Sequence, residues 1–425
     1  MSMDFSLVES IAINASVITE LKEGNTTLWQ QSVAPSEYGY AIVQINENDF
    51  ATKTPFESTT YPASVTINGN TYQNSANGFS CAIGTSLNDW ATHGIVNGIK
   101  PVYITNGAID GEPANKRDMS TWDTTKDVFT EFPFNWLGIV KDNGVVTIIF
   151  SDNDTNPDNT IFMANAFLDN SNVQQNAFHI GCTEWDTNDG SKVGSSAKVN
   201  TSITNFISYA TTKGTQYDLV TYDQATYIIA LAVLLYKTPN LQGTGDTTHG
   251  LGMGRVNTGS VQASQILTFD NDFGMYGTTA NQTTTVSFFW ILDLYGNTNT
   301  FVGSAYINAL RQLKICRGKR SSVTESDFNV TVATGLSANV SGACVMQTLG
   351  TSDGGFLPIQ TSGTDYTKGY SDLGGVYASL FPYWGGRYSY GDRAGVFFWY
   401  FYCSATDAYA GIGSRLSCKI AKASA

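Results

Sequence analysis

Basic residues are scarce in this chain of 425 residues. Lys and Arg number 23 against 36 Asp and Glu, so the formal net charge is −13. This balance argues against a nucleic-acid partner, because there is no excess of cations to neutralise phosphates. The one basic run, residues 311–320 ("RQLKICRGKR"), predicts a solvated or subunit-facing helix end, with a local anion site as the alternative.

Cysteine and histidine are also few. The 6 cysteines form no CxxC pair, and only 3 histidines accompany them. This pattern argues against a zinc cluster and against a small disulfide-stapled domain. We therefore expect free, mostly buried thiols, with a Cys403–Cys418 bridge as the alternative, and we predict no metal and no cofactor.

Long hydrophobic runs are absent. The longest, residues 228–236 ("IIALAVLLY"), has about half the length that a bilayer span needs. It predicts a buried helix, and no membrane insertion is expected. Residues 1–20 lack the basic residues and the unbroken apolar core of a signal peptide, so we expect any export to occur by release in a particle.

The residues that are present predict a folded, β-rich protein. Hydrophobic residues at 42% and aromatic residues at 12% exclude disorder, while charged residues reach only 14%. The polar surface must therefore come mostly from Asn, Thr, Ser and Gly, which are typical of strands and turns. The length predicts two or three domains.

The pattern of polar and apolar residues changes along the chain. Residues 1–125 alternate polar and apolar side chains, which predicts an N-terminal β domain, and residues 126–200 are predicted as a β-rich intermediate region. Tight hairpins are expected at "INGNTY" and "KDNGV". Within residues 201–425 we predict one helix after caps at residues 200–202, a second that stops before Pro239, and a short third around "VGSAYINALRQL", followed by strands.

Stretches that resemble known metal-binding or phosphate-binding motifs lack residues that those motifs require. "SDNDTNPDNT" (residues 151–160) does not match a calcium-binding EF-hand, since Pro157 within it and Met163 after it stand where Gly and Glu are needed. A solvated turn is favoured over a weak calcium site. "GTGDTTHGLGMG" lacks the ending of a phosphate-binding loop, and no GxSxG nucleophile motif occurs. The chain is predicted not to be an enzyme, although a carboxylate pair for glycoside cleavage stays open.

An aromatic run, "AGVFFWYFYC" (residues 394–403), has the pattern of a strand with two aromatic faces. One face would carry Val396, Phe398, Tyr400 and Tyr402, and the other Phe397, Trp399, Phe401 and Cys403. One face can be buried in a core. The other face carries two tyrosine hydroxyls, which must find hydrogen-bond partners or reach solvent. The pattern fits equally a sheet buried on both sides and an exposed recognition surface.

Four segments occur in an order that is similar to a known group. They are "AFHIGCTEWDTNDGSKVGS" (177–195), "YDQATYIIALAVLLYKTPNLQGTGDTTHGLGMG" (222–254), "GNTNTF" (296–301) and "GGRYSYGDRAGVFFWYFYCSATDAYAGIGSRLSC" (385–418). The last segment carries its signature through Gly385, Gly386, Ala394, Gly395, Gly413 and Arg415. Together they resemble phage tail-fibre and receptor-binding proteins with a C-terminal C-type lectin-like domain, the major tropism determinant-like group.

The resemblance implies a β-rich N-terminal region followed by an α+β C-type lectin-like domain at residues 201–425, in a homotrimer on the virion surface. It implies a fibre that binds a host cell-surface glycan or protein and contacts other virion structural proteins. The implied ligand-binding residues are Tyr388, Tyr390, Phe398, Tyr400, Tyr402, Ser404, Asp407 and Tyr409. We expect the receptor-binding tip of the fibre to be less acidic than the rest of the chain, because Arg387, Arg393 and Arg415 lie in or beside this run.

The chain also departs from related lectins. Residues 112–115 read "EPAN", which is not the motif of calcium-dependent sugar binding, so that activity is not predicted. Two alternative functions stay open. One is a structural head fibre or capsid decoration protein with its aromatic faces buried, and the other is a polysaccharide depolymerase.

Overall fold

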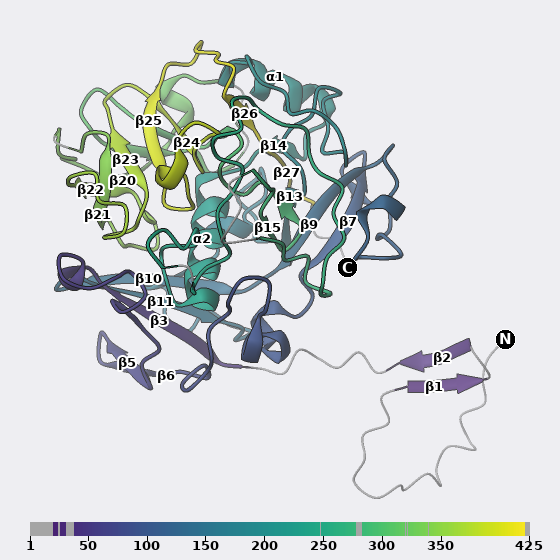
Figure 1. Cartoon of the computed structure of the whole chain (residues 1–425), viewed down its shortest axis with the longest axis horizontal. Helices are drawn as coiled ribbons and strands as arrows, with labels where there is room; N and C mark the ends of the chain where they lie inside the picture. Colours follow the sequence, from purple (N-terminus) through teal and green to yellow (C-terminus); the bar gives the residue numbers. More distant parts are fainter. Residues whose placement is uncertain are drawn as a thin grey trace, which may run out of the picture. The chain divides into compact units, whose positions relative to one another are not determined.

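A computed structural model describes residues 38–246, 248–277, 283–318, 320, 322–338 and 340–420, together with the backbone of strands β1 (Glu20–Glu23) and β2 (Thr26–Gln30). The chain divides into two units (Figure 1). In Met1–Glu37, β1 and β2 pair antiparallel. The second unit, Tyr38–Ala425, holds all the other described strands and both α-helices.

Alternating hydrophobic residues and tight turns build the first sheet of the second unit, an antiparallel sheet of order β12-β10-β11-β3-β4. Both predicted hairpins are confirmed. "KDNGV" joins β10 to β11 and "INGNTY" joins β5 to β6, with Asn143 and Asn68 in the left-handed region at φ 48° and 52°. The strands of this sheet are β3 (Tyr40–Asn46), β4 (Thr59–Thr60), β10 (Trp136–Asp142), β11 (Val145–Ser151) and β12 (Phe162–Met163), while β5 (Ser64–Ile67) and β6 (Asn70–Gln73) form a separate two-stranded sheet.

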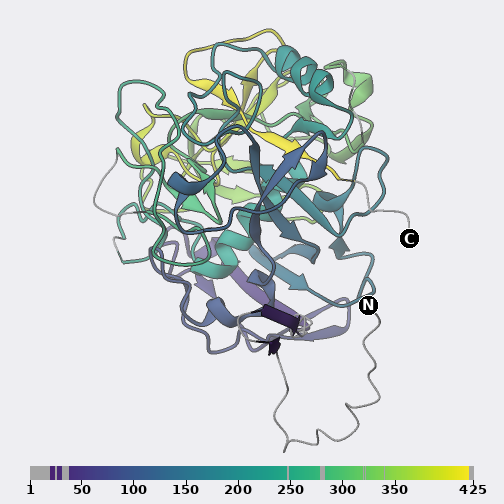
Figure 2. The same cartoon turned by 90° about the vertical axis from the view of Figure 1, so that its right-hand side faces the viewer.

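A six-stranded antiparallel sheet combines distant parts of the chain in the order β14-β27-β13-β9-β7-β8. Figure 2 shows its C-terminal strand β27, in yellow, among blue and teal strands from much earlier in the sequence. The three predicted regions all contribute strands to this sheet, and their boundaries at residues 125 and 200 stay predictions. The strands are β7 (Lys100–Thr105), β8 (Ala108–Ile109), β9 (Asp127–Pro133), β13 (Ala177–Gly181), β14 (Tyr217–Leu219) and β27 (Leu416–Cys418).

A seven-stranded mixed sheet holds the aromatic run, in the order β22-β21-β23-β25-β24-β17-β26. Two neighbouring pairs are parallel, β23 with β25 and β17 with β26. Its strands are β17 (Asn299–Phe301), β21 (Ala343–Thr348), β22 (Pro358–Thr361), β23 (Leu373–Val376), β24 (Phe381–Trp384), β25 (Trp399–Cys403) and β26 (Ile412–Ser414). Smaller sheets consist of β15 (Ser287–Phe288) with β16 (Ile291–Leu292), and of β18 (Ala305–Ile307), β19 (Leu313–Ile315) and β20 (Val330–Ala333).

The two principal predicted helices are confirmed, the first at its expected cap and the second with its end before Pro239. Helix α1 (Ile203–Lys213) begins after Ser202, whose hydroxyl accepts a hydrogen bond from the backbone N–H of Asn205. Helix α2 (Tyr222–Tyr236) begins with a capping box formed by Thr221 and Gln224. It ends at Lys237, which adopts the left-handed conformation. The described fold is therefore β-rich with two α-helices, as the sequence indicates.

Helix α2 is buried along its whole length, which agrees with an apolar sequence all round the helix. Its aromatic side chains contact all three large sheets. The Tyr227 ring lies 5.2 Å from both Phe150 of β11 and Phe178 of β13, and the Tyr222 ring lies 4.7 Å from Trp399 of β25. The helix thus fixes the aromatic strand β25 to the rest of the core.

The short helix predicted around residues 302–313 is wrong. These residues form strand β18, a turn and the start of strand β19. The side-chain carbonyl of Asn308 accepts hydrogen bonds from the backbone N–H groups of Leu310 (3.1 Å) and Gln312 (2.9 Å), and Arg311 has φ 56°. Such side-chain to backbone bonds compete with helix formation and close a turn instead.

The basic run at residues 311–320 is therefore not a helix end, and its later arginines neutralise the protein's own carboxylates. Arg317 pairs with Asp223 at 3.3 Å and with Asp353 at 2.9 Å. The buried Arg320 pairs with Asp218 at 2.5 Å.

All six cysteines are free and buried, as predicted, and the alternative Cys403–Cys418 bridge is absent. Burial raises the pKa of the Cys182, Cys403 and Cys418 thiols to about 12. These thiols are therefore protonated at neutral pH and behave as small apolar groups.

Within the residues that the structure describes, no helix has the length and apolar character needed to cross a bilayer. The same residues contain no cluster of three or more His, Cys, Asp or Glu that is placed to hold a metal ion. In the acidic stretch, Asp152 accepts the backbone N–H of Gly39 (3.0 Å) and Asp158 accepts that of Thr160 (2.9 Å). Asp158 therefore stabilises a local turn, whereas Asp152 links this stretch to Gly39 near the start of the second unit.

Candidate ligand-binding surface

Strand β25 presents two chemically different faces. Trp399, Phe401 and Cys403 are fully buried, whereas Tyr400 is half-buried and Tyr402 is 52% exposed. The predicted alternation is therefore confirmed within the strand. Because β25 pairs with β23 on one side and β24 on the other, its backbone is held on both edges (Figure 1).

The inner face of β25 belongs to the core. The Trp399 ring stacks on Trp384 of β24, with centroids 6.1 Å apart and 21° between the planes. Aromatic pairs of this kind contribute about 0.5–1.5 kcal/mol beyond the area they bury. The inner face therefore fixes the position of the outer face.

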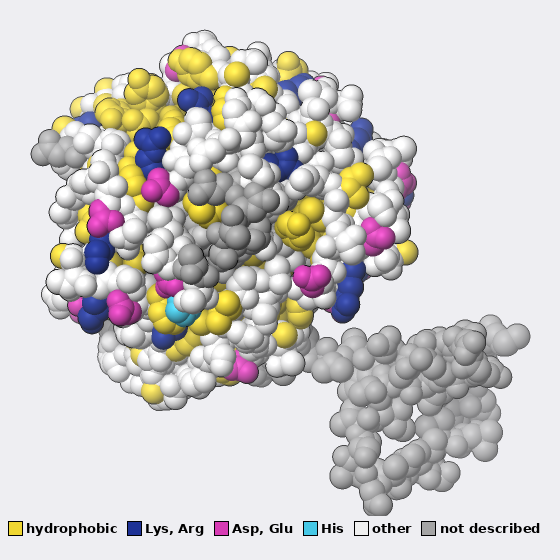
Figure 3. All heavy atoms as spheres, viewed as in Figure 1, with side chains coloured by type: hydrophobic (Ala, Val, Ile, Leu, Met, Phe, Trp, Pro, Cys, Tyr) yellow, Lys and Arg dark blue, Asp and Glu magenta, His cyan; other side chains and the backbone are white. Residues whose placement is uncertain are grey.

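Three tyrosine rings form a continuous surface on the outer side, which we call the tyrosine shelf: Tyr377, Tyr400 and Tyr402. The ring centroids lie 5.4 Å apart for Tyr400 and Tyr402, 5.8 Å for Tyr377 and Tyr400, and 5.7 Å for Tyr377 and Tyr402. Figure 3 shows hydrophobic side chains gathered at the upper left, where Figure 1 places β25, with Lys and Arg beside them.

Sequence reasoning missed Tyr377, because it lies outside the aromatic run. It follows β23 directly, and the parallel pairing of β23 with β25 brings it beside the strand. No local pattern near Tyr377 indicates this pairing. The adjacent Gly374 and Gly375 were the available signal, since glycines inside a strand mark the close approach of a neighbouring group.

Gly375 makes room for the half-buried Tyr400. A Cβ atom at Gly375 would lie 2.6 Å from the Tyr400 ring, and one at Gly342 would lie 2.9 Å from the Tyr400 hydroxyl. Burial, followed by the neighbouring Tyr377, raises the pKa of Tyr400. Its hydroxyl is therefore neutral at physiological pH and can donate a hydrogen bond to a ligand.

A second aromatic and cationic element lies in residues 385–395, which we call the glycine loop. Gly386 has φ +74°, and a Cβ atom there would lie 2.7 Å from Ala394, so the loop closes tightly on itself. The Arg387 and Arg393 guanidinium groups each lie 5.3 Å from the centre of the Tyr390 ring. The loop thus presents tyrosine and arginine side chains together.

The eight predicted ligand-binding residues differ in how exposed they are to solvent. Tyr402 and Tyr409 are the most exposed, at 52% and 48%. Five more are partly exposed: Tyr388, Tyr390, Tyr400, Ser404 and Asp407. Ser404 and Asp407 close a turn after β25, in which the Asp407 carboxylate accepts the backbone N–H of Ser404 at 2.8 Å. Their predicted role in ligand binding stays a prediction.

The expectation that Phe398 is exposed is wrong, because the Phe398 ring is fully buried. Phe398 precedes β25, so the alternation of the strand does not extend to it. Its backbone N–H donates to the carbonyl of Gly395 at 3.1 Å, and its own carbonyl accepts the N–H of Gly385 at 3.2 Å. The ring lies between Tyr383 and Tyr390, at 6.0 Å and 5.1 Å, and supports the surface from below.

Arg415 lies in the core, so the expectation that it adds charge to the tip is wrong. It is 1% exposed, and its guanidinium donates to four backbone carbonyls. These belong to Gly181 (2.9 Å), Cys182 (3.2 Å), Leu292 (2.6 Å) and Asp293 (3.3 Å). A guanidinium group has five N–H donors, so one arginine side chain can bond to several carbonyls at once.

Glu184 belongs to the same buried polar centre. It accepts hydrogen bonds from the Asn297 side chain (2.7 Å) and from the backbone N–H of Thr298 (3.1 Å). Burial and the nearby carboxylate of Asp293 raise the pKa of Glu184 to about 7. Together with Arg415, these contacts join three of the four signature segments, so much of the sequence signature marks a structural framework.

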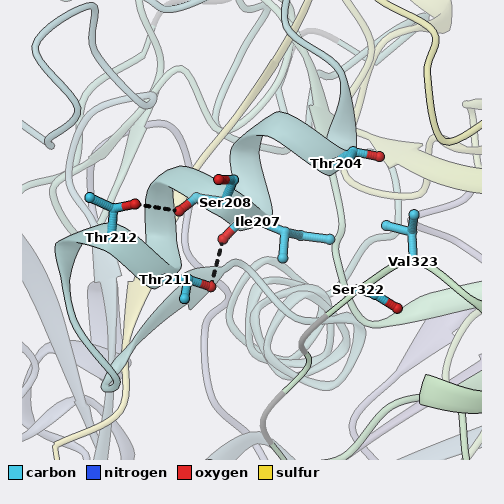
Figure 4. Close-up of a pocket in the computed structure, with 7 residues that line it drawn as sticks. All are labelled: Thr204, Ile207, Ser208, Thr211, Thr212, Ser322 and Val323. Atoms are coloured by element: carbon cyan, nitrogen blue, oxygen red, sulfur yellow. Dashed lines mark hydrogen bonds between the residues drawn. The ribbon is translucent and has the colours of Figure 1, made fainter.

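A separate groove of about 290 Å³ runs along α1 (Figure 4). It is lined by Thr204, Ile207, Ser208, Thr211, Thr212, Ser322 and Val323. The hydroxyls of Thr211 and Thr212 donate to the carbonyls of Ile207 (2.9 Å) and Ser208 (3.0 Å) within the helix. Their donors are therefore occupied, which makes this groove a weaker candidate than the tyrosine shelf.

No family model and no curated protein matches this chain. Among solved structures, it is similar to the Major Tropism Determinant P3c Variant (14% identity, 67% of this chain and 72% of that chain, TM-score 0.27). It is also similar to the Major Tropism Determinant I1 Variant (14%, 94% and 91%, 0.29) and to Treponema denticola variable protein 1 (12%, 70% and 98%, 0.28). These TM-scores are below 0.5, so the likenesses do not define the fold of this chain.

Proposed function

We propose that this protein is a non-enzymatic phage virion adhesin that binds a host cell-surface glycan or protein through the tyrosine shelf, the glycine loop and Tyr409. The observation that carries the proposal is the asymmetry of β25, whose inner face is core while its outer face carries contiguous, partly exposed tyrosines. Tyrosine supplies a large, rigid contact area with one polar group, which is typical of recognition surfaces. A contiguous patch of this kind differs from singly scattered exposed residues.

The four signature segments support the wider part of the proposal. Their resemblance to receptor-binding proteins favours a C-type lectin-like domain, a homotrimer and a place on the virion, with the N-terminal region contacting other virion proteins. A trimer repeated over a particle would engage several receptors at once. Weak single contacts would then give firm attachment through avidity.

The proposal is tested by the binding of fluorescently labelled protein to a panel of bacterial strains. The variant is Tyr402→Ala/Tyr409→Ala, which removes two exposed rings and little buried contact. The matched control is Ile266→Ala, because Ile266 is 54% exposed and lies in another part of the chain. Circular dichroism and size-exclusion chromatography verify that all three proteins are folded in the same oligomeric state.

We expect the wild type and the Ile266→Ala control to bind the same strains, and the double tyrosine variant to lose most of that binding. Two results would contradict the proposal: a wild-type protein that binds no strain, or a double variant that binds as well as the wild type.

A structural role, in a head fibre or a capsid decoration protein, is the second candidate. The half-buried Tyr400 ring favours it, because that ring lies 5.6 Å from Tyr383 and packs on Gly375, so the shelf is partly integrated into the fold. Particles that carry Tyr402→Ala separate the two roles. An interface role predicts particles that fail to assemble, whereas an adhesin role predicts particles that assemble and fail to adsorb.

A further inference from the structure

Two cations lie around one tyrosine ring at the proposed binding surface. The guanidinium carbon atoms of Arg387 and Arg393 are each 5.3 Å from the Tyr390 ring centroid, and Arg387 also lies 5.9 Å from the Tyr388 ring. A cation is attracted to the face of an aromatic ring, so the rings help to hold both guanidinium groups in place. The loop therefore concentrates positive charge in a protein whose net charge is −13.

Neither guanidinium forms an ion pair with any residue that the structure describes. Arg387 donates through Nε to the hydroxyl of Ser389 (3.0 Å), and Arg393 donates through Nε to the carbonyl of Tyr390 (3.1 Å). These bonds orient the two arginine side chains, and each bond uses only one N–H donor of its guanidinium group. The carboxylate closest in sequence, Asp392, is exposed and pairs with neither arginine within the described part of the chain.

Other arginines of the chain are used differently. Arg117 pairs with Asp272 at 2.6 Å, Arg255 with Asp293 at 3.2 Å, and Arg320 with Asp218 at 2.5 Å. Arg387 and Arg393 thus combine partial exposure, the absence of a described carboxylate partner and a position beside the tyrosine rings. That combination suits a carboxylate supplied by a ligand, because a guanidinium fork matches a carboxylate with two parallel hydrogen bonds.

We propose that the ligand is a carboxylated polysaccharide, with sugar rings on the tyrosines and a sugar carboxylate on the Arg387 and Arg393 guanidinium groups. This proposal rests on the proposed adhesin function and specifies its ligand class. A sugar ring offers an apolar C–H face that packs on an aromatic ring, and its acid group supplies the missing partner of the arginines. Because the protein as a whole repels a polyanion, binding requires local cations of this kind.

The test uses immobilised polygalacturonate, its fully methyl-esterified form and inorganic polyphosphate. The ester keeps the sugar rings and removes the charge, whereas polyphosphate keeps the charge and removes the sugar. The proteins are the wild type, Arg387→Gln/Arg393→Gln and the control Arg117→Gln, which removes an exposed arginine that pairs with Asp272 elsewhere on the surface.

We expect the wild type and Arg117→Gln to be retained on polygalacturonate on the order of tenfold more strongly than on the ester or on polyphosphate. The double arginine variant should lose that preference. Absent retention on polygalacturonate, equal retention on the ester, or equal retention on polyphosphate overturns the proposal.

Binding to bacterial cells separates this proposal from the adhesin function on which it rests. If the double arginine variant binds cells like the wild type while Tyr402→Ala/Tyr409→Ala does not, the carboxylated ligand is refuted and the adhesin function stands. If the wild type binds no cells, both fail. Loss of cell binding in both variants, with Arg117→Gln unaffected, supports both.

Discussion

Substitutions at adjacent positions of β25 should separate stability from binding. Phe401 is fully buried in the main core, so Phe401→Ala should cost about 3–5 kcal/mol of unfolding free energy, through lost burial and the cavity that remains. Tyr402 is 52% exposed, and its ring lies beside those of Tyr377 and Tyr400. Losing such ring contacts at the surface should cost about 1 kcal/mol or less.

The assay is urea-induced unfolding followed by tryptophan fluorescence, with the midpoints compared at a common slope. Tyr402→Phe is the matched control, because it keeps the ring and removes only the hydroxyl. The two-face interpretation is refuted if Tyr402→Ala destabilises the protein as much as Phe401→Ala, since the outer face must then be covered. It also fails if Phe401→Ala costs less than about 1 kcal/mol.

Two further predictions concern the buried framework, and a third concerns the tyrosine shelf. Arg415→Met should lower the unfolding free energy by about 3–5 kcal/mol, because a buried charge network loses its cation; a urea midpoint equal to that of Arg387→Met would contradict this. Glu184 has its pKa raised to about 7, so the folded state holds a proton that the unfolded chain releases from about pH 4.5 upward. The stability that protonated Glu184 contributes to the folded state is present at low pH and is lost as the pH rises through 7. The melting temperature should fall from pH 5.5 to 8 more steeply in the wild type than in Glu184→Gln, and equal slopes would contradict the assignment. Gly375→Ala should displace the Tyr400 ring, cost about 1–3 kcal/mol and weaken cell binding; unchanged binding would exclude Tyr400 from the site.

The features that the sequence predicts correctly are decided within a few residues. Asn68 and Asn143 precede glycines and close the two hairpins, because that pair adopts left-handed turn conformations at little cost. The cap at Ser202 starts the first helix, and the second helix ends before Pro239 as expected. The alternation within β25 follows from strand geometry alone, whatever lies on either side.

The features that sequence reasoning missed depend on partners far along the chain. Tyr377 joins the shelf because β23 pairs with β25, and no periodicity near Tyr377 indicates that pairing. Arg415 looks like a surface cation beside an aromatic run, yet its acceptors lie more than a hundred residues earlier in the sequence. Phe398 fits the alternation by number, but the strand begins one residue later.

The buried framework of Arg415 and Glu184 is separate from the exposed tyrosines of the proposed binding surface. Arg415 and Glu184 make their hydrogen bonds to backbone groups and polar side chains of the core, without help from Tyr402 or Tyr409. Changes at those two tyrosines therefore leave the framework bonds intact. Tyr400 differs, because its ring occupies the space above Gly375 and a larger or charged replacement would disturb the sheet. The surface thus combines one position that the fold constrains with neighbours that it leaves free, and under the proposed adhesin function we expect the free positions to set ligand preference.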